Sequence, residues 1–231
     1  MISIIIPTYM EEKYIEKTLK SIKAQDYTDY EIIVADSSSS DRTVEIARKY
    51  ADNVIVSKNR GVSLGRNLGA ENANGNILLF LDADIVLRKN FLSEIKKAFE
   101  RKKIVCVSGY VKSYGNHAHR FIFRSMSEIL YFLSKIRKPS FSGMCFSIKK
   151  DIFNKIGGFD ENLQTTEDWK MTKYARKYGR CVLVRKAKCV TSPRRLIGMG
   201  TIKGTSFHII NYIQNKMFGK AADVYSIERE G

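Results

Sequence analysis

The chain has 231 residues, of which 44% are hydrophobic and 28% charged, and its formal net charge is +16. This composition fits a folded protein with a sizeable core and excludes a disordered chain. No uncharged apolar stretch reaches the roughly 18 residues that a transmembrane helix needs, and the N-terminus lacks a signal-peptide layout. The four cysteines have no C-x-x-C spacing, so we expect reduced thiols of a cytoplasmic protein, with a Cys181–Cys189 bridge as the alternative.

The excess of positive charge predicts attraction to polyanions, namely nucleic acid, anionic lipid headgroups or phosphorylated substrates. Proteins that read RNA usually combine clustered Arg and Lys with stacking aromatics on a recognisable module. The sequence contains no such module, so we expect no nucleic-acid partner beyond a nucleotide.

In chain order, short apolar runs alternate with stretches of helical periodicity. The runs predict strands over residues 3–7, 31–35, 53–57, 77–81 and 104–110, and the intervening stretches predict helices over 14–24, 42–50, 63–73 and 90–101. This alternation is typical of an α/β fold with βαβ crossovers and a mainly parallel sheet. Ligands of such sheets bind beyond the carboxyl ends of the strands.

The most informative stretch is ILLFLDADIVL at residues 77–87, where an apolar run ends in Asp82 and Asp84. In extended chain, acids at i and i+2 point the same way, and their repulsion beside a buried edge requires a cation. A divalent metal that holds a phosphorylated ligand would supply it, because Mg²⁺ and Mn²⁺ prefer carboxylate, water and phosphate oxygens. The alternative is a solvated turn that caps the next helix.

Five further segments surround this D-x-D in a fixed order. They are PTYMEE at 7–12, ADSSSSD at 35–41, GVSLGRNLG at 61–69, GGFDE at 157–161 and EDW at 167–169. The ordered set, over residues 3–192, resembles the family 2 glycosyltransferases, which are inverting, nucleotide-sugar-dependent enzymes of GT-A fold. Two positions differ from the usual family pattern: Met10 stands where Asn is common, and Ser37 replaces the second acid of its loop. Neither a G-x-G-x-x-G nor a P-loop follows the first strand, so the phosphates of a bound nucleotide must be held by other groups.

The resemblance implies a role for each matching residue. Asp82 would sit near the ribose and metal, and Asp84 would ligate the Mg²⁺ or Mn²⁺ that bridges the diphosphate. The donor site as a whole, with Ala83 of the D-x-D included, would comprise Pro7, Tyr9, Glu11, Asp36, Arg66, Asp82, Ala83 and Asp84. The alternatives are a solvated helix charge for Arg66 and a helix-start carboxylate for Glu11.

Asp168 is the expected catalytic base, because displacing a nucleoside diphosphate with inversion requires a group that takes the acceptor's proton. It stands at the start of a helix predicted over residues 167–177, where Glu167 would raise its proton affinity. Glu167, Trp169 and Gly143 would lie on the sugar and acceptor side. The alternatives are an acid stabilised by the helix N-terminus, or, with a phosphate acceptor, a residue that only orients the sugar.

We expect one GT-A domain over residues 1–192, with a nucleotide-binding half at 1–110 and an acceptor-binding half at 111–192. Residues 193–231 would form a basic, amphipathic helical extension, in which Arg194 or Arg195 closes over the diphosphate or remains a surface charge. A basic amphipathic helix at 121–136 would either lie on an anionic membrane or pack against the sheet. Short strands at 180–185 and 187–191 complete the expected elements.

The resulting hypothesis is a metal-dependent, inverting glycosyltransferase that uses a UDP- or GDP-sugar. Its acceptor would be a glycan, a lipid-linked glycan or a polyprenyl phosphate, with the protein peripheral on the inner face of the membrane. The sequence has no Q-x-x-R-W string, which is typical of processive relatives, so a single addition is expected. The rivals are a polyanion-binding protein without catalysis and a sugar-phosphate nucleotidyltransferase, which would need a Gly-rich loop after the first strand.

Overall fold

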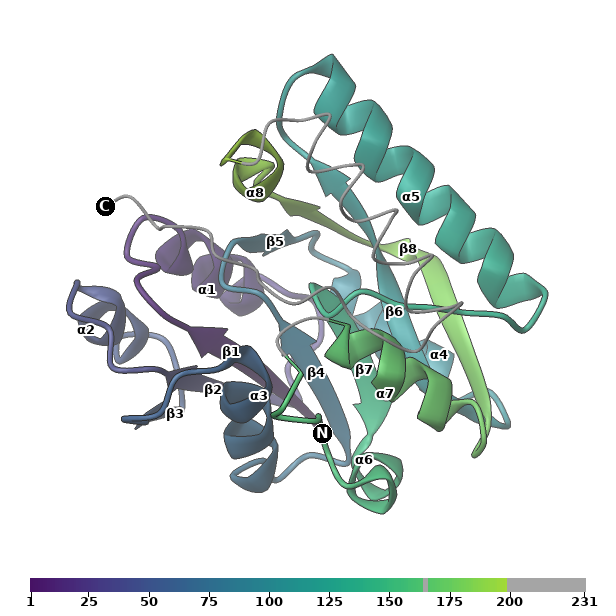
Figure 1. Ribbon diagram of the computed structural model, residues 1–231, viewed down its shortest axis with the longest axis horizontal. Helices are drawn as coiled ribbons and strands as arrows, with labels where there is room; N and C mark the ends of the chain where they lie inside the picture. Colours follow the sequence, from purple (N-terminus) through teal and green to yellow (C-terminus); the bar gives the residue numbers. More distant parts are fainter. Residues whose placement is uncertain (164–165, 199–231) are drawn as a thin grey trace.

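The structure is a computed structural model that describes residues 1–163 and 166–198. Its elements form one eight-stranded sheet in the order β3-β2-β1-β4-β7-β6-β8-β5, with helices on both faces (Figure 1). The fold is therefore α/β, as predicted. The expected helical extension at 193–231 lies outside the described residues, apart from the short helix α8 (Arg194–Gly198).

The first half of the chain supplies a parallel block of strands. Each strand except the last is followed by a crossover helix, which explains the alternating pattern in the sequence. The elements are β1 (Ile2–Thr8), α1 (Ile15–Lys23), β2 (Tyr30–Asp36), α2 (Thr43–Ala47), β3 (Asn53–Val56), α3 (Val62–Glu71) and β4 (Ile77–Leu81). Strands β1, β2, β3 and β4 all run in the same direction. Their carboxyl ends therefore meet at one edge of the sheet.

The second half extends the sheet with mixed strand directions. Strand β7 is antiparallel to both β4 and β6, β6 is parallel to β8, and β5 is antiparallel to β8. The elements are β5 (Ile85–Leu87), α4 (Phe91–Phe99), β6 (Ile104–Ser113), α5 (His117–Lys135), β7 (Cys145–Lys149), α6 (Lys150–Ile156), α7 (Glu167–Ala175) and β8 (Arg180–Thr191). Because β4 and β6 both oppose β7, they run the same way.

The core has two layers, one on each face of the sheet. Helices α1, α2 and α4 pack on one face, and α3, α6 and α7 pack on the other. In the second layer Phe80 lies at the centre of an aromatic group, with its ring centroid 4.9 Å from that of Phe159 in an edge-to-face arrangement. Helix α5 contacts β6 and β8 and runs beside the β8 edge of the sheet (Figure 1).

Glycines bring α3 unusually close to β1. Gly65 and Gly69 are four residues apart and so share one face of this helix. A Cβ atom at Gly69 would overlap the Ile5 side chain, and one at Gly65 would lie 3.2 Å from Pro7 Cβ. This close approach places Arg66, which follows Gly65, beside the carboxyl end of β1.

Several elements differ from the sequence expectation. The strands predicted at 180–185 and 187–191 are a single strand, β8, whose register against β6 shifts between the pairs Gly109–Val184 and Tyr110–Lys188. A bulge therefore accommodates the polar residues that had suggested a break. The sequence analysis did not predict β5, β7 or α6, and α2 ends earlier than residue 50.

The four cysteines are buried and unbridged, so the expected reduced thiols are present and the alternative Cys181–Cys189 bridge is absent. Within residues 1–163 and 166–198, no helix has the length and apolar character to cross a bilayer.

Candidate active site

Four acids gather at the carboxyl edge of the parallel strands. Glu11 follows β1, Asp36 ends β2, and Asp82 and Asp84 follow β4. Their exposed fractions are only 6%, 1%, 7% and 6%, respectively. Buried carboxylates are costly unless donors or cations surround them, so their partners indicate how the site is built.

Asp36 is held in place by donors from the end of β1 and from the loop that follows β2. Thr8 Oγ1 donates to Asp36 Oδ2 over 2.8 Å, and the Ser39 hydroxyl donates to the same oxygen over 2.6 Å. The Ser39 backbone N–H donates to Asp36 Oδ1 over 2.7 Å. Three donors fix the orientation of this carboxylate before any ligand is present.

Pro7 lies near the end of β1, and Tyr9 directly follows this strand. Pro7 packs against Gly65, and the Arg60 guanidinium lies 4.4 Å from the centre of the Tyr9 ring. Both residues are partly exposed. They therefore offer an apolar and an aromatic surface next to Asp36, in the place where the sequence analysis expected the nucleoside.

Asp82, Ala83 and Asp84 form a tight turn between β4 and β5, with the Ile85 N–H donating to the Asp82 carbonyl over 3.2 Å. The extended geometry on which the sequence analysis based a common direction for the two acids is therefore absent, because the chain turns between β4 and β5. The Ala83 carbonyl accepts a hydrogen bond from Thr18 Oγ1 over 2.7 Å, which ties the turn to α1. Asp82 and Asp84 consequently contact partners in different segments.

Arg66 joins the turn to the second half of the chain. Its guanidinium donates to Glu167 Oε1 over 2.6 Å, to Asp82 Oδ1 over 3.3 Å and to the Gly143 carbonyl over 3.2 Å. It is 3% exposed, and its charged carbon lies 5.2 Å from the centre of the Phe159 ring. Burial alone would lower the pKa of Arg66, but the charges of Glu167 and Asp82 raise it above its ordinary value. The alternative of a solvated helix charge is therefore wrong.

Gly143 is the point where Arg66 and Asp168 meet. Its carbonyl accepts from Arg66 and its N–H donates to Asp168 Oδ2. A Cβ atom at this position would lie 2.5 Å from an Arg66 terminal nitrogen, so a larger residue would displace the guanidinium. The segment that the sequence analysis assigned to the acceptor side thus contacts the charged network directly.

Asp168 lies at the start of α7, where its surroundings shift its pKa. The Trp169 N–H donates to its Oδ1 over 2.7 Å. Burial, followed by the neighbouring negative charge of Glu167, raises the pKa of Asp168 to about 7, although Arg66 opposes this rise. A carboxylate with a pKa near neutrality can both accept and release a proton under physiological conditions.

The residue before this pair, Thr166, has a φ of 69°, in the left-handed region that a β-branched residue rarely adopts. Backbone strain of this kind concentrates at functional sites, where the surrounding structure enforces it. This backbone conformation directly precedes α7, the helix that begins with Glu167 and Asp168.

A second arginine, Arg194, bridges two of the acids. Its Nε donates to Asp84 Oδ2 over 2.9 Å and a terminal nitrogen donates to Glu11 Oε1 over 2.7 Å. The guanidinium stacks over Tyr14, 4.3 Å from the ring centre. Burial alone would lower the pKa of Arg194, but its hydrogen bond to Glu11 raises it. Arg194, one of the two arginines that the sequence offered for this role, therefore contacts two of the acids directly.

The donor set around Asp82 and Asp84 fits a hard divalent cation. Glu11 Oε2 is buried and has no hydrogen-bond partner among the described residues. The acids around Arg194 therefore keep one carboxylate oxygen that a ligand could contact. The described residues contain no group of three His, Cys, Asp or Glu side chains arranged to hold a metal ion by themselves. Two carboxylates nevertheless suit Mg²⁺ or Mn²⁺, which usually takes its remaining ligands from phosphate and water.

Sequence reasoning did not identify four of the supporting residues. Thr8 and Ser39 hold Asp36, Tyr14 supports Arg194, and Thr191 Oγ1 lies 3.4 Å from Asp84 Oδ1. Thr8, Ser39 and Tyr14 stand within or beside the matched segments, so proximity in sequence could have signalled them. Thr191 carries no such signal, because only the pairing of β5 with β8 brings it to Asp84.

The comparison with known families is decisive at this point. The family described as Glycosyl transferase family 2 matches residues 3–157. The chain belongs to glycosyl transferase family 2. This match includes the D-x-D turn, Arg66 and Gly143, and it ends before Asp168.

Curated relatives in family 2 are similar over part of their length. Glycosyltransferase AglE of Haloferax volcanii is 30% identical over 190 residues, which cover 77% of this chain and 62% of AglE. The GalNAc(5)-diNAcBac-PP-undecaprenol beta-1,3-glucosyltransferase of Campylobacter jejuni is 31% identical over 175 residues, which cover 72% of this chain and 57% of that protein. The chain thus spans less than two thirds of the length of these relatives.

Solved structures share the family 2 GT-A fold. A mannosyltransferase, PcManGT from Pyrobaculum calidifontis in complex with GDP-Man and Mn²⁺, superposes with a TM-score of 0.77 at 24% identity, over 96% of this chain and 65% of that one. Residues 1–349 of Staphylococcus aureus TarS, in complex with UDP-GlcNAc, give a TM-score of 0.69 at 22% identity, over 95% of this chain and 73% of that one. At these identities the likeness establishes the fold.

We predict that replacing Asp168 by Asn stabilises the protein at and above neutral pH. Folding raises the pKa of Asp168 from 3.8 to about 7, so the folded state keeps a proton that the unfolded state releases. As the pH rises between these values the wild-type protein loses stability, and the uncharged amide abolishes this loss. Chemical denaturation across this range measures the effect. A stability difference between the two proteins that does not change with pH would contradict the raised pKa.

Proposed function

We propose that this protein is an inverting, metal-dependent glycosyltransferase that moves a sugar from a UDP- or GDP-sugar to an acceptor. One observation carries the proposal: Arg66 and Gly143 connect Asp168, whose pKa is about 7, to Asp82, the first of the two buried acids that follow β4. A group able to accept a proton therefore lies in the same network as carboxylates suited to a metal–diphosphate pair.

The donor nucleotide would occupy the carboxyl edge of β1, β2 and β4. Pro7 and Tyr9 would flank the base, and Asp36, already oriented by Thr8 and Ser39, would accept hydrogen bonds from the nucleoside. Glu11, in the loop that follows β1, would complete this side of the donor site. This assignment makes residues 1–110 the nucleotide-binding half and residues 111–192 the acceptor-binding half of one domain.

Asp84, with Asp82 nearby, would hold the Mg²⁺ or Mn²⁺, which when bound neutralises the charge that develops on the leaving diphosphate. Arg194 would supply a second positive charge for the diphosphate, from the protein itself. In the structure it pairs with Asp84 and Glu11, so it lies beside the corner that the diphosphate would enter. We propose that Arg194 moves from these carboxylates to the diphosphate when the donor binds, because a phosphate oxygen offers it equivalent charge-assisted hydrogen bonds.

Asp168 would act as the base. The acceptor hydroxyl gives its proton to Asp168 while its oxygen forms a bond to the anomeric carbon of the sugar. The bond from this carbon to the diphosphate breaks on the opposite side, the nucleoside diphosphate leaves, and the configuration inverts. Glu167, Gly143 and Trp169 would position the sugar and the acceptor around this base.

The acceptor would be a glycan or a lipid-linked glycan. The Campylobacter jejuni relative is named for an undecaprenol-linked substrate, which supports the lipid-linked class for this chain. Such an acceptor would place the protein peripherally on the inner face of a membrane. The two structural relatives are complexed with GDP-Man and UDP-GlcNAc. The proposal therefore keeps both GDP-sugars and UDP-sugars as candidate donors.

We predict that nucleotide binding depends on a divalent metal and on Asp84. Calorimetric titration with UDP and GDP should give measurable binding of one of them with Mn²⁺ present and at least about tenfold weaker binding after chelation. Asp84→Asn should weaken the metal-dependent binding to a similar degree. The control is Asp151→Asn, which removes an exposed carboxylate of α6 that pairs with Lys155 and should bind as the wild type does. Equal binding with and without metal would contradict the metal assignment.

We predict that Asp168→Asn abolishes sugar transfer but leaves the binding of the donor nucleotide unchanged. Sugar transfer or donor hydrolysis, screened over common UDP- and GDP-sugars, should fall by at least about 10²-fold, because the amide accepts no proton. Nucleotide affinity should remain within the range of the wild type. Full activity in this variant would remove Asp168 from the reaction, whereas loss of nucleotide binding would assign it to the donor site.

A further inference from the structure

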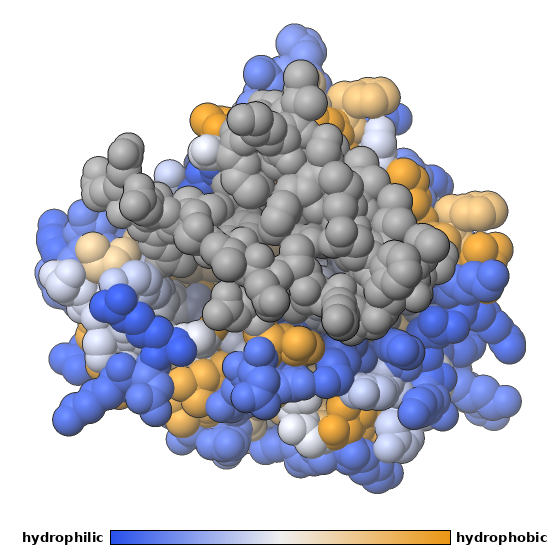
Figure 2. Space-filling view, in the orientation of Figure 1, coloured by the Kyte–Doolittle hydropathy of each residue, from blue (hydrophilic) through white to orange (hydrophobic). Residues whose placement is uncertain are grey.

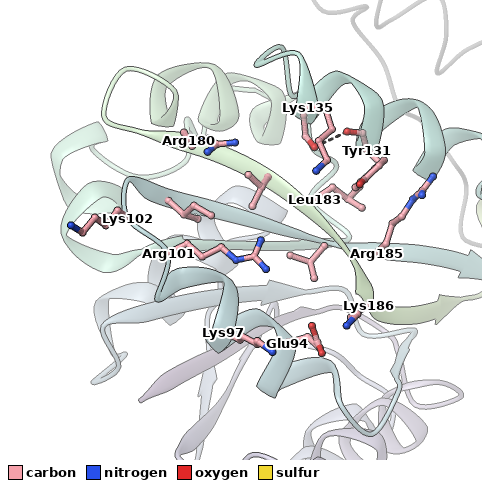
Figure 3. Close-up of a pocket in the computed structure, with 14 residues that line it drawn as sticks. Glu94, Lys97, Arg101, Lys102, Tyr131, Lys135, Arg180, Leu183, Arg185 and Lys186 are labelled. Atoms are coloured by element: carbon pink, nitrogen blue, oxygen red, sulfur yellow. Dashed lines mark hydrogen bonds between the residues drawn. The ribbon is translucent and has the colours of Figure 1, made fainter.

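A basic pocket lies at the far edge of the sheet, where β8 runs between α4 and α5 (Figure 3). It encloses about 280 Å³, which is enough for a phosphorylated headgroup. The residues drawn in Figure 3 come from α4 and the turn that follows it, the start of β6, the first half of β8 and the last turns of α5. Its cationic side chains are Lys97, Arg101, Lys102, Lys135, Arg180, Arg185 and Lys186.

The charges of this pocket are poorly compensated. Glu94 is the one acid among the described residues that line it. Arg185 pairs with Glu128 and stacks on Tyr131, 4.1 Å from the ring centre, but the other cations form no ion pair with another described residue. Like charges gathered around one cavity raise the local positive potential and attract a multivalent anion.

A second depression continues the same surface. It is lined by Arg88, Asn90, Lys112, Lys186 and Lys188, and it shares Lys186 with the first pocket. No acid stands among these lining residues. The two depressions together form a continuous surface, which we call the basic groove.

The first pocket of the basic groove is separate from the carboxylate site. It borders Ile104 and Arg180, where β6 and β8 begin. The acids of the candidate active site follow the carboxyl ends of β1, β2 and β4, and β4 runs in the same direction as β6. An occupant of the first pocket would therefore leave the donor site open.

The helix that borders the basic groove also exposes apolar side chains. Tyr131 and Lys135 of α5 line the pocket, while Phe121, Ile129 and Phe132 of the same helix are 72%, 58% and 63% exposed. Hydrophobic side chains stand along the α5 edge of the molecule in Figure 2. A soluble phosphate would satisfy the cations only, whereas an anionic bilayer offers phosphates to the groove and acyl chains to the helix.

We propose that the basic groove and the exposed face of α5 together dock the protein on an anionic lipid bilayer. Headgroup phosphates occupy the groove, and Phe121, Ile129 and Phe132 enter the interfacial region beside it. These residues lie outside the carboxylate site, so this proposal and the transferase proposal can fail separately.

The test is flotation of the full chain with vesicles, in the presence of chelator and without any donor. The protein should bind vesicles that contain phosphatidylglycerol and should not bind vesicles of phosphatidylcholine alone. Reversing two groove charges, Arg101→Glu with Lys186→Glu, should lower binding by at least about tenfold. Replacing two exposed rings, Phe121→Gln with Phe132→Gln, should lower it to a comparable degree.

The matched control reverses one Lys and one Arg elsewhere, namely Lys23→Glu with Arg48→Glu on the exposed surfaces of α1 and α2. It changes the net charge equally and should leave vesicle binding within about threefold of the wild type, because distant charges are screened. Thermal unfolding of each variant confirms that it is folded.

Three results would overturn the proposal. Equal losses in the groove and control variants would mean that net charge alone is responsible. Competition by soluble glycerol phosphate, with no effect of the ring substitutions, would assign the groove to a free phosphate ligand. Binding of an RNA oligonucleotide that depends on Arg101 and Lys186, without vesicle binding, would assign it to nucleic acid.

Discussion

The buried guanidinium of Arg66 is the interaction on which the candidate site depends. It lies on α3, which approaches β1 closely because of its glycines, and it contacts Asp82, Gly143 and Glu167. These partners come from the turn after β4, the segment before β7 and the start of α7. A buried charge of this kind is tolerable only when all its partners are in place. The two halves of the chain are therefore held in one fixed arrangement around a single cation.

Charge compensation also explains the rest of the site. Buried acids would repel one another, but each acid of the D-x-D turn has its own arginine. Arg66 pairs with Asp82, and Arg194 pairs with Asp84. Burial, followed by the negative charge of Glu167, raises the pKa of Asp168 to about 7, and Glu167 rather than Asp168 takes the close contact with Arg66. One arginine thus fixes the geometry while it leaves the neighbouring carboxylate able to exchange a proton.

Much of the nucleotide half could be predicted from sequence, because its strands are continuous apolar runs and its helices have clear periodicity. The four parallel strands and the gathering of Glu11, Asp36 and Asp82 follow from that pattern. The second half could not be predicted as well, since β5 has only 3 residues and the bulge in β8 resembles a break. The turn at Asp82–Asp84 and the pairing of Arg194 with Glu11 depend on tertiary contacts between distant segments, which local pattern does not encode.

The most direct test of this account is a double-mutant cycle between Arg66 and Glu167, read as the free energy of unfolding in denaturant. Arg66→Met and Glu167→Gln each leave a buried charge without its partner, so the pair should show a coupling energy of at least about 2 kcal/mol. The exposed pair Arg42 and Glu45, 3.0 Å apart, serves as the control and should show less than about 1 kcal/mol. Additive effects of the Arg66 and Glu167 substitutions would contradict the claim that this guanidinium holds the site together.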